Sequence, residues 1–192
     1  MPVRQNITVY GASSPSLDPV FTNAAYELGQ LIGQAGKNLF TGAGSTGLMA
    51  AVEDGALDKG GHVTGIIPQF MIDNGWLHQG LSEVISTPDI HIRKSMLAQK
   101  ADAVVALPGG TGTLEELTEI ITWKMLGLFK KPVIILNTDH YYDALLQMLK
   151  NGLDRGFIGD EFATLWAVAE TPAQAMLLID SIPDWTSTAS KI

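Results

Sequence analysis

Short runs of β-branched and other apolar residues alternate along this chain with longer segments of helical periodicity. Such alternation is typical of an α/β domain in which helices connect the parallel strands of one sheet. The runs expected to form strands are 7–10, 38–41, 62–67, 83–86, 103–107, 132–136 and 165–169. The segments expected to form helices are 21–32, one that begins near 48, 93–100, 114–128, 141–153 and one that begins at Pro172.

Length and composition suit a single globular unit. The chain has 192 residues, of which 46% are hydrophobic and 17% charged, enough apolar residues for a sizeable core. We therefore predict one domain over residues 1–192, an α/β fold with a mostly parallel sheet flanked by helices on both faces. Two segments give no regular pattern: 69–80, compatible with a short helix or a loop, and 185–192, expected to be a loose tail.

The excess of acidic over basic residues limits the partners of this protein. The formal net charge is -8, from 20 acidic and 12 basic residues, and no run of lysine or arginine occurs. Because nucleic acids and anionic membranes attract basic surfaces, we expect neither as a partner. A small anionic ligand remains compatible, since backbone N–H groups at a helix start bind phosphate whatever the net charge.

Cysteine is absent from the sequence, which excludes disulfides, thiolate metal sites and a cysteine nucleophile. The four histidines show no spacing typical of a metal site, so neither a metal nor a cofactor is expected. The N-terminal residues 1–7 lack the apolar stretch of a signal peptide, and no apolar run is long enough to span a bilayer. A cytoplasmic location is therefore expected.

The segment 107–116, Leu-Pro-Gly-Gly-Thr-Gly-Thr-Leu-Glu-Glu, is the strongest functional signal. Its glycines allow a sharp turn between a strand and a helix and let a ligand approach the backbone closely. Thr113 is expected to cap the helix together with Glu116, as in a Ser/Thr-x-x-Glu capping box. A phosphate over this helix start would meet free N–H groups and the positive end of the helix dipole. The alternatives are a turn without a ligand and a Glu116 that is only a capping partner.

Two further loops follow predicted strands, where ligands of parallel sheets bind. The segment 42–47, Gly-Ala-Gly-Ser-Thr-Gly, has the glycine spacing of a dinucleotide fingerprint but follows the second strand, and no acidic residue ends the third. We interpret it as one wall of a mononucleotide site, with a turn that only serves packing as the alternative. The segment 11–14, Gly-Ala-Ser-Ser, offers small residues and hydroxyls to the edge of such a site, although a plain turn is equally compatible.

Several motifs of this chain occur together in one known family. Residues 108–116 match the signature P-G-G-x-G-T-x-x-E, and Arg93-Lys94 stands where that family has an Arg-Lys pair. Residues 44–49 resemble its glycine-rich G-[SN]-x-G-L-M segment, and the likeness extends over about 9–158. In these motifs the chain resembles the LOG ("Lonely guy") family of cytokinin riboside 5′-monophosphate phosphoribohydrolases, whose members were long labelled lysine decarboxylases.

This resemblance implies a Rossmann-like fold and a homodimer with sites near the subunit interface. It also implies that the substrate is a small nucleoside monophosphate, AMP or an N6-substituted AMP, whose N-glycosidic bond is hydrolysed. By the same resemblance, Arg93 and Glu116 are expected to be catalytic. The residues expected to bind the substrate, from the family motifs and the loops above, are Ser13, Gly44, Ser45, Gly47, Arg93, Lys94, Gly109, Gly110, Thr111, Gly112, Thr113 and Glu116.

The chain departs from the family pattern at a few positions. Ile92 stands where the family often has glutamate, and Ala43 where it often has glycine. Three other functions remain compatible with the sequence. They are a non-catalytic nucleotide-binding or carrier module, a structural or signalling dimer, and a lysine decarboxylase, which would need a lysine that holds pyridoxal phosphate.

Overall fold

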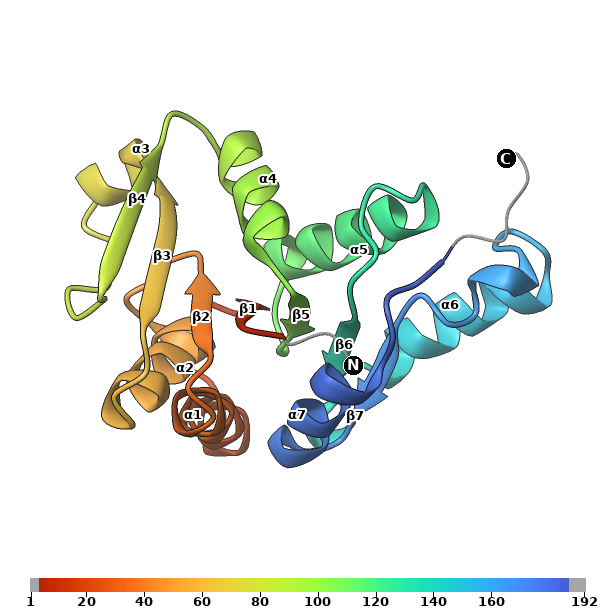
Figure 1. Ribbon diagram of the computed structural model, residues 1–192, viewed down its shortest axis with the longest axis horizontal. Helices are drawn as coiled ribbons and strands as arrows, with labels where there is room; N and C mark the ends of the chain where they lie inside the picture. Colours follow the sequence, from red (N-terminus) through yellow and green to blue (C-terminus); the bar gives the residue numbers. More distant parts are fainter. Residues whose placement is uncertain (1–3, 187–192) are drawn as a thin grey trace.

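A seven-stranded sheet covered by helices forms the centre of the computed structural model, which describes residues 4–186 (Figure 1). All six pairings between its strands are parallel, which confirms the predicted sheet. The strands follow the spatial order β4-β3-β2-β1-β5-β6-β7. Their bounds are β1 (Asn6–Tyr10), β2 (Asn38–Thr41), β3 (Val63–Pro68), β4 (Glu83–Thr87), β5 (Ala103–Ala106), β6 (Val133–Leu136) and β7 (Ala167–Ala169).

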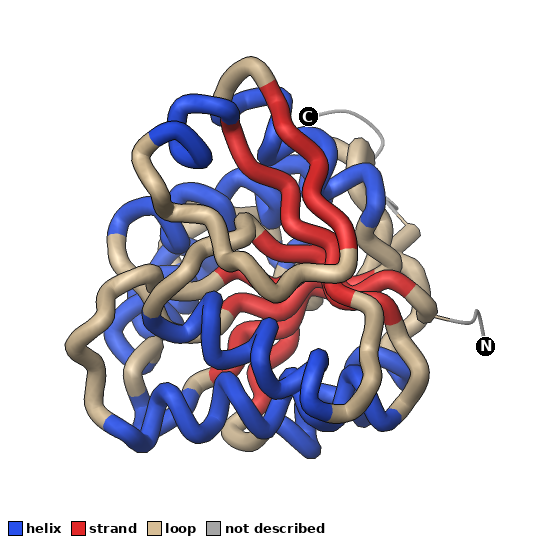
Figure 2. Tube along the Cα trace, turned by 90° about the vertical axis from the view of Figure 1, so that its left-hand side faces the viewer, coloured by secondary structure: helices blue, strands red, loops and turns tan. Residues whose placement is uncertain are grey.

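Helices pack on both faces of the sheet (Figures 1 and 2). One face is covered by α1 (Pro19–Gln34), α2 (Gly47–Asp58) and α7 (Pro172–Ser181). The other face is covered by α4 (Ile90–Lys100), α5 (Thr111–Met125) and α6 (Asp143–Asp154), while the short helix α3 (Gln69–Asp73) follows β3. Within residues 4–186, no helix is both long and apolar enough to cross a membrane.

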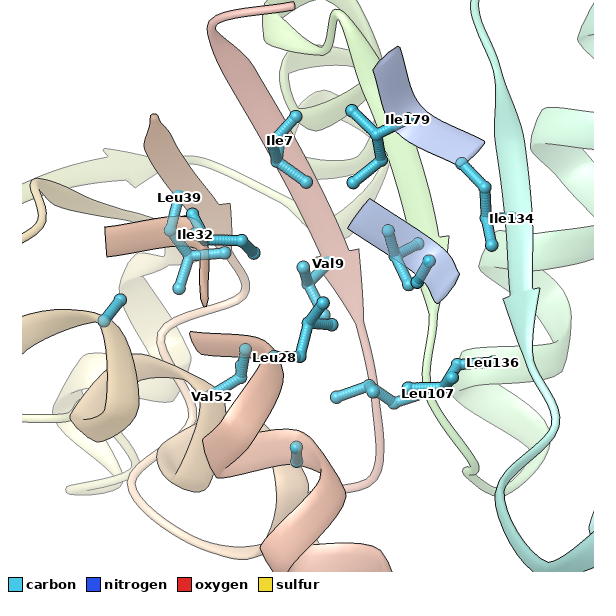
Figure 3. Packing of buried hydrophobic residues seen from close by; sticks show 14 of the residues in the cluster. Ile7, Val9, Leu28, Ile32, Leu39, Val52, Leu107, Ile134, Leu136 and Ile179 are labelled. Atoms are coloured by element: carbon cyan, nitrogen blue, oxygen red, sulfur yellow. The ribbon is translucent and has the colours of Figure 1, made fainter. Parts of the chain in front are cut away.

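The central strands are buried on both faces, as expected for a parallel sheet between helices. Ile7 and Val9 of β1 pack with Leu28 and Ile32 of α1 (Figure 3). Tyr10 belongs to the core on the opposite face, together with residues of α4 and α5. This alternation places Tyr10 on the face where the helices that follow β4 and β5 begin.

Strand order reverses between β1 and β5, since β2, β3 and β4 lie on one side of β1 and the later strands on the other. The loops at the carboxyl ends of these two strands are joined by a hydrogen bond from the Ala12 N–H to the Pro108 carbonyl, 3.1 Å long. A reversal of this kind leaves a crevice at the carboxyl edge of the sheet. The fold therefore places the glycine-rich loops around one point.

Two helix starts differ from the sequence-based prediction. Helix α4 begins at Ile90 and not at Arg93, because the Asp89 side chain accepts a hydrogen bond from the Ile92 N–H, 2.8 Å long, and caps the helix. Helix α5 begins at Thr111 after Gly110, whose carbonyl accepts the first intrahelical bond, from Leu114. The predicted capping box of Thr113 with Glu116 is therefore wrong, since both residues lie inside the helix.

The predicted loose tail begins too early. Trp185 donates its backbone N–H to the Lys130 carbonyl at 2.7 Å, and its ring lies 6.1 Å from that of Phe162, measured between centroids. Trp185 is therefore packed on the domain. Residues 187–192 of that tail, like residues 1–3, lie outside the described part of the chain.

A buried glutamate of α2, Glu53, lies beneath the loop that follows β2. The Thr41 hydroxyl accepts a hydrogen bond from the Ala43 N–H, 3.1 Å long, and donates its own proton to Oε1 of Glu53. Oε2 of Glu53 has no hydrogen-bond partner among the described residues. Burial raises the pKa of Glu53 to about 8, although the hydrogen bond from Thr41 opposes this rise.

We expect the free energy of unfolding to fall as the pH rises from about 5 to 8. In this range folded Glu53 keeps a proton that the unfolded chain loses, so stability declines by up to about 1.4 kcal/mol per pH unit. Urea denaturation of the wild type and of Glu53→Gln across this range measures the effect. The variant, neutral at every pH, should show a flatter curve.

The exposed Glu27 of α1 provides the control for this experiment. Glu27→Gln should keep the wild-type dependence on pH. Equal slopes for the wild type and Glu53→Gln would show that Glu53 is ionised throughout and that the prediction is wrong.

Candidate functional site

A cavity of about 690 Å³ lies at the carboxyl edge of the sheet, around the point where strand order reverses. This volume is within the range of small-molecule sites, roughly 300–1,000 Å³. The loops after β1, β2 and β5 and the start of α4 all contribute to its walls. The cavity is therefore where the topology of the sheet predicts a ligand.

Most of the residues predicted to bind a ligand line this cavity, and two do not. Gly47 and Gly109 lie behind the lining, where they allow close packing: a Cβ on Gly47 would meet the carbonyls of the 11–14 loop, and one on Gly109 would meet the Thr113 side chain. The predicted residues that line the cavity are Ser13, Gly44, Ser45, Arg93, Lys94, Gly110, Thr111, Gly112, Thr113 and Glu116.

Arg93 of α4 and Glu116 of α5 meet in the wall of the cavity. Nη2 of Arg93 lies 3.1 Å from Oε1 of Glu116, and the two residues are only 8% and 7% exposed. The contact has the distance of an ion pair but not the orientation of a hydrogen bond. Within the described chain, Nε of Arg93 and Oε1 of Glu116 have no hydrogen-bond partner. Buried polar atoms of this kind are normally satisfied, so Nε of Arg93 is free to donate a hydrogen bond to a ligand and Oε1 of Glu116 is free to accept one.

Burial raises the pKa of the Glu116 carboxyl above its ordinary value, while the positive charge of Arg93 opposes this rise. Burial likewise raises the pKa of Tyr10, with the nearby charge of Glu116 acting in the same direction. Tyr10 is therefore a buried, neutral phenol near the Arg93–Glu116 pair. Ionisable groups with pKa values displaced by burial in a cavity are typical of functional sites.

Gly42 provides the space that the Arg93 side chain occupies. A Cβ at this position would overlap Nη2 of Arg93. The glycine-rich loop after β2 thus lies directly against the guanidinium that contacts Glu116. Gly42 belongs to the predicted wall 42–47, but its contact with Arg93 was not predicted, because that contact depends on a residue far along the chain.

Lys94 is also buried, but its charge is already paired. Its Nζ lies 2.6 Å from Glu115 and 3.2 Å from Glu119, both on α5. Although burial lowers the pKa of Lys94, these hydrogen bonds outweigh it and raise the pKa. Lys94 therefore remains a cation, and its ion pairs with Glu115 and Glu119 link α4 to α5 beside the Arg93–Glu116 pair.

The start of α5 is open to the cavity, whereas the start of α2 is closed. The N–H groups of Leu48 and Met49, at the beginning of α2, both donate to the Ala12 carbonyl, at 2.8 and 3.2 Å. At the start of α5 the first intrahelical bond comes from Leu114, and the preceding N–H groups of 111–113 have no carbonyl within the helix to bind. An anion in this cavity is therefore expected at α5.

Part of the cavity wall is apolar and was missed by the sequence analysis. Met49, Met71, Trp76 and Ile90 line it. Trp76 reaches the site because its carbonyl accepts a hydrogen bond from the Ser45 N–H, 2.9 Å long, and the chain around it pairs with the glycine-rich loop. In the segment 69–80, which the sequence left unassigned, the tryptophan that follows Gly75 is a residue that could have indicated this apolar wall. In the structure its side chain is half-exposed.

Among residues 4–186, the structure shows no group of three or more histidine, aspartate or glutamate side chains that could hold a metal ion.

Comparison with known proteins assigns the chain to a family. The family model described as "possible lysine decarboxylase" matches residues 49–179. A protein of Oryza sativa subsp. japonica named cytokinin riboside 5′-monophosphate phosphoribohydrolase LOG is 37% identical over 182 residues, which cover 94% of this chain and 75% of the relative. The protein LOG7 of Arabidopsis thaliana, with the same activity in its name, is 42% identical over 154 residues, which cover 80% and 71%. The chain belongs to the LOG family.

A solved structure also resembles this LOG family member. The molybdenum cofactor binding protein from Rippkaea orientalis superposes with a TM-score of 0.72 at 27% identity, over 93% of this chain and 97% of that one. The expected Rossmann-like fold is thereby confirmed. The LOG signature at 108–116 lies on the β5–α5 loop and in the first turns of α5, where it forms one wall of the cavity.

Gly47, although predicted to touch a ligand, has a structural role that can be measured. Its φ is +70°, and a Cβ would lie 2.6 Å from each of the carbonyl oxygens of Ala12 and Ser14. Gly60 has a nearly identical φ of +71° but nothing within 4 Å of such a Cβ. We expect Gly60→Ala to cost about 1 kcal/mol in unfolding free energy from the backbone alone, and Gly47→Ala at least about 2 kcal/mol more.

Urea denaturation of both variants measures this difference. Gly47→Ala should also displace the 11–14 loop. Equal losses of unfolding free energy in the two variants would mean that the 11–14 loop moves aside without cost. Gly47 would then be required only for its positive φ.

Proposed function

We propose that this LOG family member hydrolyses the N-glycosidic bond of a nucleoside 5′-monophosphate of the cytokinin riboside type, AMP or an N6-substituted AMP, and releases the base and ribose 5-phosphate. The observation that carries the proposal is the buried pair of Arg93 and Glu116 beside an open helix start. The relatives' names support the same activity. We further propose that the protein is a homodimer and that it acts in the cytoplasm.

The 5′-phosphate binds at the start of α5 in this proposal. Thr111, Gly112 and Thr113 line the cavity there, and their N–H groups precede the first intrahelical hydrogen bond. Gly110 and Gly112 would leave open space around the anion, since a Cβ at either would meet nothing within 4 Å. Binding at this remote group positions the ribose for attack.

Glu116 then lies where the anomeric carbon of the ribose is expected. Water adds its oxygen to this carbon while the bond to the base nitrogen breaks, and the departing base takes a proton. Positive charge builds on the ribose as the bond breaks, and an adjacent carboxylate stabilises it or accepts the proton of the attacking water. Arg93 keeps Glu116 oriented and supplies its free Nε as a donor to the nucleotide.

The base occupies the apolar part of the cavity. Met71 and Trp76 come from the segment after β3, on the far side of the glycine-rich loop from α5. An aromatic ring and thioethers suit the flat face of a purine and an apolar substituent on its N6. We therefore expect an N6-isopentenyl group to be accepted in addition to plain AMP.

Lysine decarboxylation, the description of the family model, fits this cavity poorly. That chemistry requires pyridoxal phosphate bound to a lysine that has lost its proton. Lys94 is the lysine in the cavity lining, and Glu115 and Glu119 hold it as a cation. The residues present do not provide the nucleophilic lysine that this cofactor needs.

The substitution Glu116→Gln tests the proposal directly. Purified protein is incubated with AMP and with isopentenyladenosine monophosphate, and free base is measured by chromatography. We expect base release by the wild type and a loss of about 100-fold or more in the variant, which removes the charge but keeps the shape.

Glu119→Gln is the matched control, because Glu119 stands one turn further along α5 and lies outside the cavity lining. It should retain activity within a few-fold. Nucleotide binding without base release would favour a carrier instead, a role in line with the name of the molybdenum cofactor binding protein.

The rate of base release should fall as the pH is lowered, with a midpoint above the ordinary glutamate pKa of 4.5. Glu116 must be ionised in each of its possible roles, and burial raises its pKa. The measurement is kcat at saturating nucleotide between pH 4 and 9. Residual release by Glu116→Gln serves as the control, because the substrate phosphate itself titrates near pH 6. A midpoint shared by both proteins would assign the titration to the substrate and not to Glu116.

A further inference from the structure

Tyr141 lies behind the glycine-rich loop of 108–110, outside the cavity lining. It follows the 3-10 turn Thr138–His140, which comes after β6, the neighbour of β5 in the sheet. Asp139 and His140 in this turn both adopt positive φ angles, 49° and 59°, a conformation that residues with a side chain adopt at a cost. The chain therefore uses an unfavourable backbone shape at the point where Tyr141 is placed.

The side chain of Tyr141 is fixed at its ring and at its hydroxyl. The ring packs edge-on against Phe21, with centroids 5.9 Å apart, and against Tyr142, with centroids 5.0 Å apart. The hydroxyl donates a hydrogen bond to the Gly109 carbonyl, 2.8 Å long. A tyrosine that is 46% exposed is thus held against one particular peptide group.

That peptide group joins Gly109 to Gly110. It is planar and trans, so its C=O and its N–H point in opposite directions. With the Gly109 oxygen bound on the Tyr141 side, the N–H of Gly110 is turned away from Tyr141, and Gly110 lines the cavity. A peptide between two glycines rotates more freely than any other, so a fixed partner is needed to hold one orientation.

We infer that Tyr141 is a positioning residue for the phosphate subsite: its hydroxyl holds the Gly109–Gly110 peptide so that the Gly110 N–H faces the anion at the start of α5. The identity of the full substrate rests on the proposed function. The orientation of the N–H, in contrast, acts on any ligand that carries the phosphate.

Tyr141→Phe removes the hydroxyl and keeps the ring between Phe21 and Tyr142. We expect the KM for AMP to rise about tenfold, the effect of one misplaced hydrogen bond to a charged group, while kcat stays within about twofold. The inhibition constant of ribose 5-phosphate should rise by the same factor. That of adenosine, which lacks the phosphate, should not change.

Tyr142→Phe is the matched control. The Tyr142 hydroxyl donates an equivalent hydrogen bond, 2.7 Å long, to the Leu107 carbonyl, two residues before the loop peptide. This variant should lower the melting temperature by a few degrees and leave all three constants unchanged. If both variants changed KM equally, Tyr141 would have only a general structural role and the inference would fail. An unchanged KM in Tyr141→Phe would also overturn it.

Direct binding separates this inference from the proposed function. If the wild type releases no base, the proposed function fails, and calorimetry with ribose 5-phosphate replaces the kinetic constants. Affinity about tenfold weaker in Tyr141→Phe than in the wild type and in Tyr142→Phe would still support the inference. Equal affinity in the three proteins, or no binding to any of them, would overturn it.

Discussion

The pairing of β1 with β5 is the constraint on which the site depends. Both strands are buried on both faces, and the order of the sheet reverses between them. The loops at their carboxyl ends therefore lie side by side and bind each other through Ala12 and Pro108. The same Ala12 carbonyl closes the start of α2, whereas nothing comparable occupies the start of α5 within the described chain. The N–H groups at the start of α2 are thus used in a contact within the fold. Those at the start of α5 are left available to an anion.

The Arg93–Glu116 pair is poorly explained by stability alone. A buried ion pair contributes little net stability, because the loss of hydration offsets the attraction between the charges. Here the cost is higher, since Nε of Arg93 and Oε1 of Glu116 lack hydrogen-bond partners among the described residues. Tyr10, neutral and buried beside them, adds no charge to the pair. The nucleotide of the proposed function would complete these hydrogen bonds, which would explain why the pair is buried there.

Local sequence patterns were sufficient for the sheet and for the loops that carry the motifs, because strand and helix periodicity and glycine-rich turns are local properties. They were insufficient where a contact joins distant segments. Trp76 enters the cavity by pairing with the loop at Ser45, and Gly42 matters because Arg93 passes over it. The predicted cap of α5 was wrong because Gly110 and Thr113 both suit a helix start, and the local sequence does not distinguish them; in the structure the helix begins after Gly110.

Two of the departures from the family pattern, at Ile92 and Ala43, are accommodated away from the Arg93–Glu116 pair. Ile92 donates its backbone N–H to the Asp89 cap, and its side chain is 42% exposed and outside the cavity lining. Arg93 is held instead by Glu116 and by the space at Gly42, so an acid at position 92 is not needed to orient it. Ala43 has a φ of 60°, and its methyl group lies in the space that Gly65 leaves by lacking a side chain. Because neither change reaches Arg93 or Glu116, the preference of this enzyme for one base over another is expected to depend on Met71 and Trp76 in the apolar part of the cavity.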